Sequence, residues 1–303
     1  MASFWDVQRK NTLYSYGLVL LFIPLIAGLG LVASNLFYGG AWIFPVAILF
    51  AIFYSIGGYW FGDSVVLAVS GAHPADERAQ AYLINTVEGL ALAAGIPKPK
   101  LYVIDDPSPN AFATGRDPAH ASIAVTSGLL STMNREQLEG VLSHEMSHIR
   151  NFDTRFMTVV IVLVGLVAIL ANMLSNMFFF GSMRRDDNER GGGGGLLMIL
   201  GLVLIILGPL FAQLVRLAIS RKREFLADAS GAQLSRNPEG LASALERLKG
   251  AAPMSNANSD TPPLFISDPA GGEKGKKSLG QSVANLFSTH PPLDERIKAL
   301  RSM

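Results

Sequence analysis

The chain contains no cysteine in its 303 residues. Disulfide bonds are therefore excluded as a source of stability, and thiolates are excluded as metal ligands. A zinc site in this chain must be built from histidine and carboxylate side chains alone. The lack of cysteine is also compatible with a reducing compartment.

Charged residues are scarce as well. They make up 16% of the chain, against about 25% in an ordinary soluble domain, and 50% of the residues are hydrophobic. With a mean hydropathy of +0.33, this composition predicts a protein embedded in the lipid bilayer. The net charge of +1, with no interleaving of aromatic and basic residues, gives no basis for nucleic-acid binding.

Only five histidines are present, yet two of them belong to an H-E-x-x-H motif formed by His144, Glu145 and His148. Asn134, with Gln137 three residues later, predicts a capping box at the start of a helix. At about 100° per residue, positions i and i+4 lie within about 40° of each other, so both imidazoles can bind one ion. Glu145 follows His144 directly, so its side chain points to one side of the two histidines. There its carboxylate can act as a general base on a metal-bound water without binding the metal. The alternative is a solvated helix face that happens to carry two histidines.

Two long apolar runs stand near the N-terminus, Leu13 to Phe37 and Ala41 to Phe61. Each is long enough to cross a bilayer, and two glycines connect them, so we predict a transmembrane hairpin. The first run is longer than a signal-peptide core and lacks a good cleavage site, which predicts a retained anchor. Arg9 and Lys10 precede it and the connection has no basic residue. The positive-inside rule therefore places the N-terminus and the chain after the hairpin in the cytoplasm.

From Asp63 to about Thr154 the charge density is that of a water-soluble domain. Ala75 to Ala94 has helical periodicity, and Gly95 is a natural C-cap. Three further segments predict a small sheet beside the H-E-x-x-H helix: Lys100 to Ile104, Pro109 to Gly115 and Ser122 to Thr126. An edge strand here could pair with an extended peptide. The alternative for Asn110 and the residues after it is an ordinary half-buried strand with a turn asparagine.

Two later apolar runs, Phe156 to Phe180 and Leu196 to about Leu214, predict a second membrane hairpin. The second run is marginal in length and contains Pro209, so whether it crosses fully is left open. A polar segment with five consecutive glycines joins the runs and predicts a flexible linker. Basic residues outside the hairpin outnumber those in its connection by a small margin. The positive-inside rule therefore gives mixed evidence on which side of the membrane the connection lies.

Glu224 and Asp228 are four residues apart on a predicted helix, so both carboxylates can face the histidine pair. One carboxylate would complete a His₂Glu set with an open position, and the other could accept the free N–H of a ligand histidine. The alternative is a surface helix with ordinary i, i+4 charge pairing. After Asp228, residues Pro238 to Lys249 are predicted to form a helix. Residues 251–278 are predicted to form a loop, and the last residues a short terminal helix.

The chain resembles the HtpX-type membrane zinc metalloproteases, relatives of the CAAX-prenyl endoproteases within the gluzincin-like group. Four motifs in a fixed order carry this resemblance: Asn110-Ala-Phe-Ala-Thr-Gly115, Ser143-His-Glu-Met-Ser-His-Ile-Arg-Asn-Phe-Asp153, Glu224-Phe-Leu-Ala-Asp228 and Thr289-His-Pro-Pro-Leu-Asp-Glu-Arg296. The five-glycine tract departs from the family pattern and concerns only the connection within the second hairpin.

The resemblance implies one Zn²⁺ per subunit, bound by His144, His148 and Glu224. It implies that Glu145 is the catalytic base and that Asp228 hydrogen-bonds a ligand histidine without binding the metal itself. These assignments follow from the matching motifs and not from the spacing alone.

The resemblance further implies that Asn110 and the strand around it contact the substrate. It places His290 and Arg296 near the cleft as candidate stabilisers of the tetrahedral intermediate. It also implies a multi-pass protein of a bacterial-type inner membrane whose active site faces the cytoplasm.

We therefore expect a mainly α integral membrane protein with transmembrane helices and a cytoplasmic α+β gluzincin-like zinc metalloprotease domain that contains a small β-sheet. Residues 1–62 and 156–215 are the expected membrane hairpins. Residues 63–155 and 216–303 are the expected two parts of the protease domain.

The expected function is zinc-dependent cleavage of membrane or misfolded proteins in membrane protein quality control, with Glu145 activating the attacking water. Its partners are protein substrates and the lipid bilayer. One alternative is a processing protease for lipidated tails. Another is a membrane scaffold with a structural zinc site, although such sites usually close the fourth position with a protein ligand.

Overall fold

A computed structural model describes residues 4–36, 40–163, 165–166, 221–249, 266 and 291–303. The chain divides into two compact units. Unit 1 comprises residues 1–14, 61–158 and 218–303, and unit 2 comprises residues 15–60 and 159–217. Both units are therefore assembled from segments far apart in the sequence, and each is described by itself.

Unit 2 is built around two long helices, most of α1 (Phe4–Leu36) and much of α2 (Ile43–Val69), which a short 3₁₀ turn (Gly40–Trp42) joins. Each helix contains a stretch long and apolar enough to cross a membrane, Gln8–Gly28 and Ile43–Val69. The predicted second run ended at Phe61, whereas α2 continues through Val69. The extension follows from Val65, Val66 and Leu67, which continue the apolar pattern past Asp63.

Apolar side chains hold unit 2 together. Phe22 and Ile26 of α1 and Ala51 of α2 form a buried cluster with side chains from the helical residues 159–163 and 165–166. The Tyr54 hydroxyl donates a hydrogen bond of 2.9 Å to the carbonyl of Val162. The rest of the predicted second hairpin, including the glycine tract, lies outside the described residues.

The sheet of unit 1 has the strand order β1-β2-β4-β3. Strands β2 and β4 are parallel, and β1 and β3 pair antiparallel at the two edges. Their bounds are His73–Pro74 for β1, Lys100–Ile104 for β2, Ala111–Gly115 for β3 and Ala121–Thr126 for β4. The three predicted strands are confirmed. Strand β1 was not predicted, because two residues are too few to show an alternating pattern.

Helix α3 (Ala81–Ala94) begins later than the predicted Ala75. The Asp76 carboxylate accepts from the N–H groups of Arg78 and Ala79, which holds the preceding residues in a turn. The other end is as predicted, since Gly95 has φ 68° and terminates the helix in the left-handed conformation. The short helix α4 (Ser127–Thr132), which directly follows β4, was not predicted.

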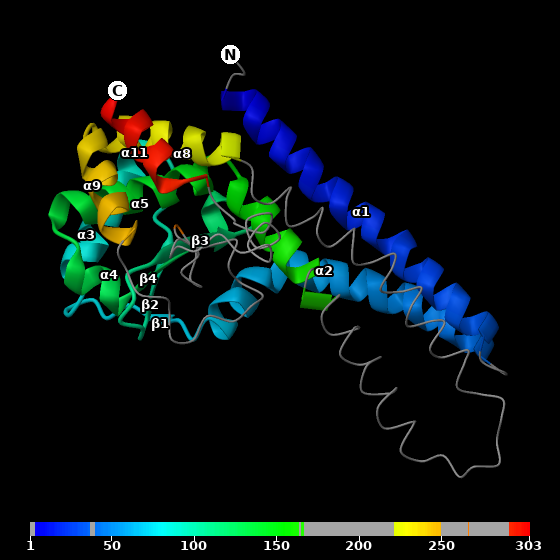
Figure 1. Ribbon diagram of the computed structural model, residues 1–303. Coiled ribbons are helices and arrows are strands. Elements are labelled where there is room, and N and C mark those ends of the chain that lie inside the picture. The colour runs from blue at the N-terminus through cyan, green and yellow to red at the C-terminus, as the bar shows by residue number, and fades with distance from the viewer. Residues whose placement is uncertain (1–3, 37–39, 164, 167–220, 250–265, 267–290) are drawn as a thin grey trace, which may run out of the picture. The chain divides into compact units, whose positions relative to one another are not determined.

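Helix α5 (Arg135–Arg150) is the central helix of unit 1 and is buried along most of its length. The predicted capping box is confirmed: the Gln137 N–H donates to Asn134 Oδ1 at 2.9 Å, and the Asn134 N–H donates to Gln137 Oε1 at 3.1 Å. Figure 1 shows α5 gathered with the helices that follow it. These are α8 (Arg221–Ser235), α9 (Pro238–Lys249) and α11 (Leu293–Arg301).

Two glycines allow the backbones of these helices to approach each other. A Cβ at Gly140 of α5 would lie 2.5 Å from the backbone nitrogen of Leu241 in α9. A Cβ at Gly231 of α8 would lie 3.0 Å from the backbone nitrogen of His144. Helix α8 therefore crosses α5 directly at the first residue of the H-E-x-x-H motif.

Candidate metal centre

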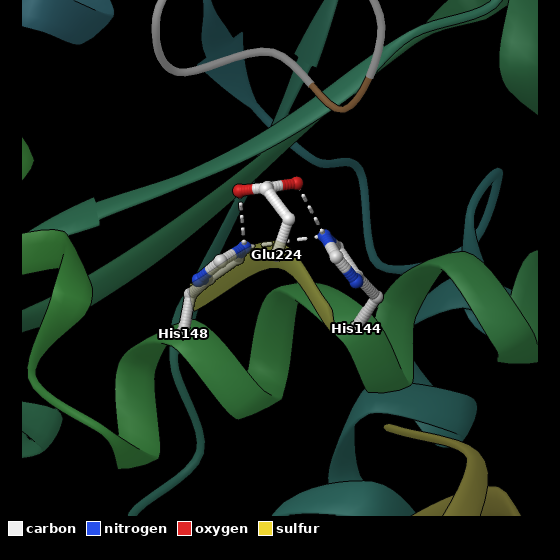
Figure 2. Close-up of side chains that lie close together, drawn as sticks. All are labelled: His144, His148 and Glu224. Atoms are coloured by element: carbon white, nitrogen blue, oxygen red, sulfur yellow. Dashed lines mark hydrogen bonds and ion pairs between the residues drawn. The ribbon is translucent and has the colours of Figure 1, made fainter. Parts of the chain in front are cut away.

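His144, His148 and Glu224 converge from two crossing helices, α5 and α8 (Figure 2). The two histidine Nε2 atoms are 3.1 Å apart. The Glu224 carboxylate lies 3.8 Å from Nε2 of His144 and 3.6 Å from Nε2 of His148. All three side chains are buried.

These separations fit a metal ion. A tetrahedral zinc ion with ligands at about 2.0–2.1 Å would hold neighbouring ligand atoms about 3.3 Å apart. The observed separations of 3.1 to 3.8 Å require shifts of about half an ångström or less. Two imidazoles and one carboxylate also match the donor set of a catalytic zinc site that keeps one position open. His144, His148 and Glu224 could therefore hold the ion.

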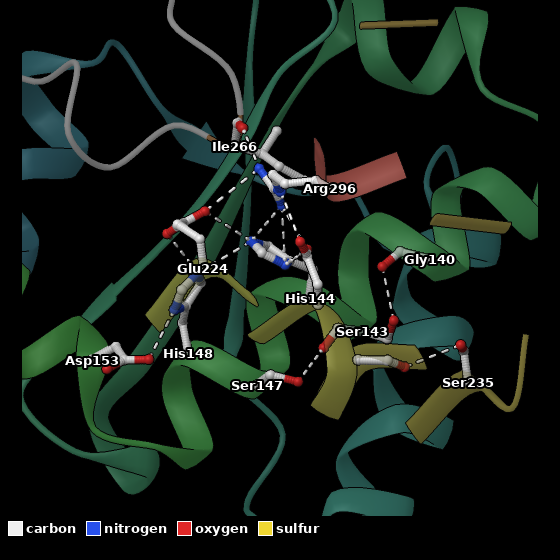
Figure 3. A network of polar contacts seen from close by, with 12 residues as sticks. Gly140, Ser143, His144, Ser147, His148, Asp153, Glu224, Ser235, Ile266 and Arg296 are labelled. Carbon is white, nitrogen blue, oxygen red and sulfur yellow. Dashed lines mark hydrogen bonds and ion pairs between the residues drawn. The ribbon is translucent and has the colours of Figure 1, made fainter. Parts of the chain in front are cut away.

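Each histidine is oriented by its own carboxylate, and Figure 3 shows this for His148 and Asp153. Nδ1 of His144 lies 2.9 Å from Oδ1 of Asp228, and Nδ1 of His148 lies 3.0 Å from Oδ2 of Asp153. Because each carboxylate accepts the Nδ1 proton, each ring presents Nε2 to the centre. Asp228 thus lies behind a histidine, while Glu224 faces both Nε2 atoms.

The two imidazoles differ in charge. Burial lowers the pKa of His144 to about 4, so its ring is neutral near pH 7. Burial also acts to lower the pKa of His148, but Asp153 and Glu224 outweigh it and raise the pKa to about 9. A protonated His148 can donate its Nε2–H to a neutral Nε2 of His144 across the 3.1 Å that separates them. An incoming cation must displace this proton.

Glu145 is buried beside the same three residues. Burial raises the pKa of Glu145 to about 7; His148 opposes the shift and Glu224 adds to it. The backbone N–H of Ala113 in β3 also hydrogen-bonds the carboxylate. A carboxylate with a pKa near 7 is well matched to accept and return a proton at neutral pH.

Strand β3 presents its outer edge towards this region. The Asn110 carbonyl accepts from the Thr126 N–H of β4, and backbone groups alternate in direction along a strand. The Ala111 carbonyl and the Ala113 N–H therefore point to the opposite edge. There the Ile266 N–H donates to the Ala111 carbonyl at 2.9 Å.

Arg296 of α11 is fully buried against the centre. Its Nε and Nη2 bind the two oxygens of Asp228 at 2.8 and 2.7 Å, and its Nη1 lies 3.5 Å from Glu224. Burial acts to raise the pKa of Asp228, but Arg296 and His144 outweigh it and lower the pKa to about 2. Helices α8 and α11 are thus joined by a buried bidentate ion pair.

The sequence also singled out Asn110 and His290. Asn110 is buried at the start of β3, where its Oδ1 accepts from the Ala111 N–H at 3.1 Å. His290 lies outside the described residues.

Sequence reasoning gave no role to Asp153 or Asn11. Asp153 had a detectable signal, a carboxylate just past the end of the helix and five residues after His148. Asn11 had none, because it reaches Asp153 across 142 residues of sequence.

Known proteins resemble the chain over most of its length. The model of peptidase family M48 matches residues 77–303. A protease HtpX homolog of Caldanaerobacter subterraneus subsp. tengcongensis is 43% identical over 301 residues, covering 99% of this chain and 97% of that relative. A protease HtpX homolog of Streptococcus thermophilus is 44% identical over 305 residues, covering 99% of each chain.

The fold has a solved counterpart in the crystal structure of S. mikatae Ste24p. The two superpose with a TM-score of 0.50 at 17% sequence identity, covering 97% of this chain. This chain spans 66% of the length of that structure. The likeness is one of fold alone. With matches of this extent, the chain belongs to peptidase family M48 and is a membrane zinc metalloendopeptidase of the HtpX type.

Proposed function

We propose that this protease hydrolyses peptide bonds of membrane or misfolded proteins in membrane protein quality control, with Glu145 as the general base. The observation that carries the catalytic part of the proposal is the burial of Glu145 beside His144, His148 and Glu224, which raises the pKa of its carboxyl group. A bound zinc ion supplies a Lewis acid that polarises a carbonyl and lowers the pKa of water.

The chain's own residues then have distinct tasks. Glu145 accepts a proton from the attacking water and returns it to the leaving amine. His144, His148 and Glu224 hold one zinc ion per subunit. Asp228 keeps the His144 ring in the tautomer that presents Nε2.

Arg296 acts on this centre through Asp228 and Glu224, the two carboxylates that it contacts. Because its guanidinium is fully buried in that ion pair, a positioning role is better supported than direct contact with the tetrahedral intermediate. His290 remains a candidate for that contact.

Strand β3 and Asn110 are proposed to receive the substrate backbone. The Ala111 carbonyl faces the outer edge of the sheet and already accepts an N–H from Ile266, so this edge can bind an extended chain. Main-chain hydrogen bonds of this kind do not depend on the substrate side chains. Such tolerance suits a protease that acts on many unfolded sequences.

We further propose a gluzincin-like protease domain facing the cytoplasm of a bacterial-type inner membrane, with residues 63–155 and 216–303 as its two parts. The multi-pass membrane part comprises residues 1–62 and 156–215. The candidate spans in α1 and α2 and the basic residues before the first run support this arrangement.

The substrate class is tested with two membrane-anchored reporters that differ by one destabilising substitution in their soluble domain. Purified full-length protease and each reporter are placed together in liposomes. Where the unfolded population limits cleavage, about 1.4 kcal/mol of destabilisation should raise the rate about tenfold. Equal rates for the two reporters would contradict the quality-control role. Cleavage confined to a third reporter with a lipidated tail would favour the processing-protease alternative.

A further inference from the structure

The first turns of α1 bind the C-terminal end of α5 in unit 1. The Gln8 side chain donates to the carbonyl of Arg150 at 2.7 Å. The Asn11 amide donates to the carbonyl of Asn151 at 3.0 Å and to Oδ1 of Asp153 at 2.6 Å. The last carbonyls of a helix have no partner within it, so these side chains satisfy groups that α5 itself cannot.

The Asp153 carboxylate contacts Asn11 and His148 and, at a longer distance, Arg223, whose Nε lies 3.8 Å from Oδ1. Asn11 binds Oδ1 at 2.6 Å. Oδ2 lies 3.0 Å from Nδ1 of His148, the contact drawn in Figure 3. Asn11 and Asp153 are both buried, with 4% and 0% exposure. The Asn11 amide makes the shortest of these contacts with the carboxylate, at 2.6 Å, and so helps to fix its plane, and the carboxylate in turn helps to fix the plane of the His148 ring.

The backbone before Asp153 is held in an unusual conformation. Phe152 has a φ of 60°, a left-handed value that a bulky residue rarely adopts. This turn brings Asp153 back towards His148 after α5 has ended. Such a conformation persists only where surrounding contacts determine it, and the two bonds from Asn11 are among those contacts.

We infer that Asn11 is a positioning residue of the metal centre, acting on His148 through Asp153. The inference rests on the proposed ligand role of His148. It ties metal affinity to the contact between α1 and α5. Since the same helix contains the candidate span Gln8–Gly28, the N-terminal anchor contributes to the site as well as to membrane attachment.

The test uses the full-length protein in detergent, freed of metal and titrated with Co²⁺. Asn11→Leu keeps a similar volume but removes the donor. It should weaken Co²⁺ affinity by roughly three- to tenfold, less than the roughly 10- to 100-fold typical when a ligand's direct partner is lost. The visible absorption of bound Co²⁺ should also change. The matched control is Gln8→Leu, which breaks a contact with α5 that does not involve Asp153, and it should keep wild-type affinity and absorption.

A double-mutant cycle separates positioning from general stability. If Asn11 acts through Asp153, adding Asn11→Leu to Asp153→Asn should cause no further loss of Co²⁺ affinity. Fully additive losses would overturn the inference, and so would an Asn11→Leu protein that unfolds at a lower temperature but binds Co²⁺ like the wild type.

If Asn11→Leu does not fold, Asn11→Asp is measured instead, since it keeps the shape and replaces the donor amide by a carboxylate; wild-type affinity in that variant overturns the inference. His148→Ala is the reference for the ligand set. If it binds Co²⁺ like the wild type, the proposed ligand set itself fails. If it loses Co²⁺ while Asn11→Leu does not, only the role of Asn11 fails.

Discussion

At the residue scale, the centre depends on a few buried groups whose charges balance one another. Asp153 and Glu224 favour a proton on His148 and raise its pKa, whereas burial disfavours the ionised form of Glu145 and raises its pKa. The same negative groups that favour the proton on His148 would favour a divalent cation in its place. Proton and metal therefore compete for one position.

This competition predicts that metal affinity rises with pH. The pKa of His148 in the folded protein is raised from 6.5 to about 9. Its contribution to the stability of the metal-free fold is therefore complete below pH 6.5 and is lost as the pH rises towards 9. Over the same window the metal dissociation constant should fall by up to about tenfold per pH unit for each proton displaced.

Competition with a chelator at several pH values measures this dependence. Asp153→Asn is the control, because removing the negative charge beside His148 should flatten the profile. A wild-type affinity that is constant between pH 6.5 and 9 would show that no proton leaves His148 when metal binds.

The two carboxylates of α8 should respond differently to substitution. Glu224→Ala should lose most of the bound zinc, because Glu224 alone of the pair faces both Nε2 atoms. Asp228→Asn should retain zinc with an affinity lowered by roughly 10- to 100-fold, as losses of outer partners generally are. Metal analysis of both purified variants decides the matter, and the opposite ranking would reverse the two assignments.

Sequence reasoning was most powerful for local pairs of residues. His144 with His148, and Glu224 with Asp228, are four residues apart, so the helical period alone places each pair on one face. The contacts of Asn11 with Asp153 and of Arg296 with Asp228 span 142 and 68 residues. Such contacts depend on tertiary packing, which no local pattern encodes.

At the element scale, α5 is held by helices that approach its backbone closely. Gly140→Ala should lower the stability of the fold by about 1–3 kcal/mol, the usual cost of overpacking, because the new methyl group would meet the Leu241 backbone at 2.5 Å. Gly89→Ala in α3 is the matched control. A Cβ at Gly89 meets nothing within 4 Å, so this substitution should be neutral or stabilising by about 0.5–1 kcal/mol.

Denaturation of both variants in detergent compares them directly. The prediction fails if Gly140→Ala unfolds at the same denaturant concentration as Gly89→Ala. Zinc content should be measured on the folded fractions, so that loss of metal is not mistaken for loss of the fold.

Element boundaries were predictable where the chain carries an explicit stop or start signal. Asn134 with Gln137 marked the start of α5, and Gly95 marked the end of α3. The start of α3 was misplaced because the turn formed by Asp76 competes with the helix. Strand β1 owes its existence to pairing with β2 and has no pattern of its own.

At the scale of the whole molecule, the absence of cysteine makes the topology measurable. Single cysteines introduced as Lys98→Cys and Ala41→Cys lie at exposed positions of unit 1 and of the hairpin connection, respectively. In intact cells an impermeant maleimide should label the cysteine at position 41. The cysteine at position 98 should react only after the membrane is opened. The reverse pattern would place the protease domain outside the cytoplasm.

Composition and hydropathy predicted the membrane class, and α1 and α2 both meet the requirements of a membrane span. They could not predict how units 1 and 2 are each assembled from distant segments. That arrangement depends on contacts such as those of Asn11 with the end of α5. Cytoplasmic placement and the domain boundaries remain predictions.

The proposed mechanism depends above all on Glu145 acting as the base beside a zinc ion. Glu145→Gln keeps the shape of the side chain but removes the oxygen that accepts the proton. His144→Ala is the reference variant, in which zinc content and activity should be lost together.

The most direct measurement scores zinc content and chelator-sensitive cleavage of casein side by side, with purified protein in detergent. We expect Glu145→Gln to hold near-normal zinc while its cleavage rate falls by at least about a hundredfold, the usual scale of a general acid–base contribution. Equal cleavage by Glu145→Gln and the wild type would contradict the catalytic role of Glu145. A wild type that holds zinc yet cleaves nothing, itself included, would favour the scaffold alternative.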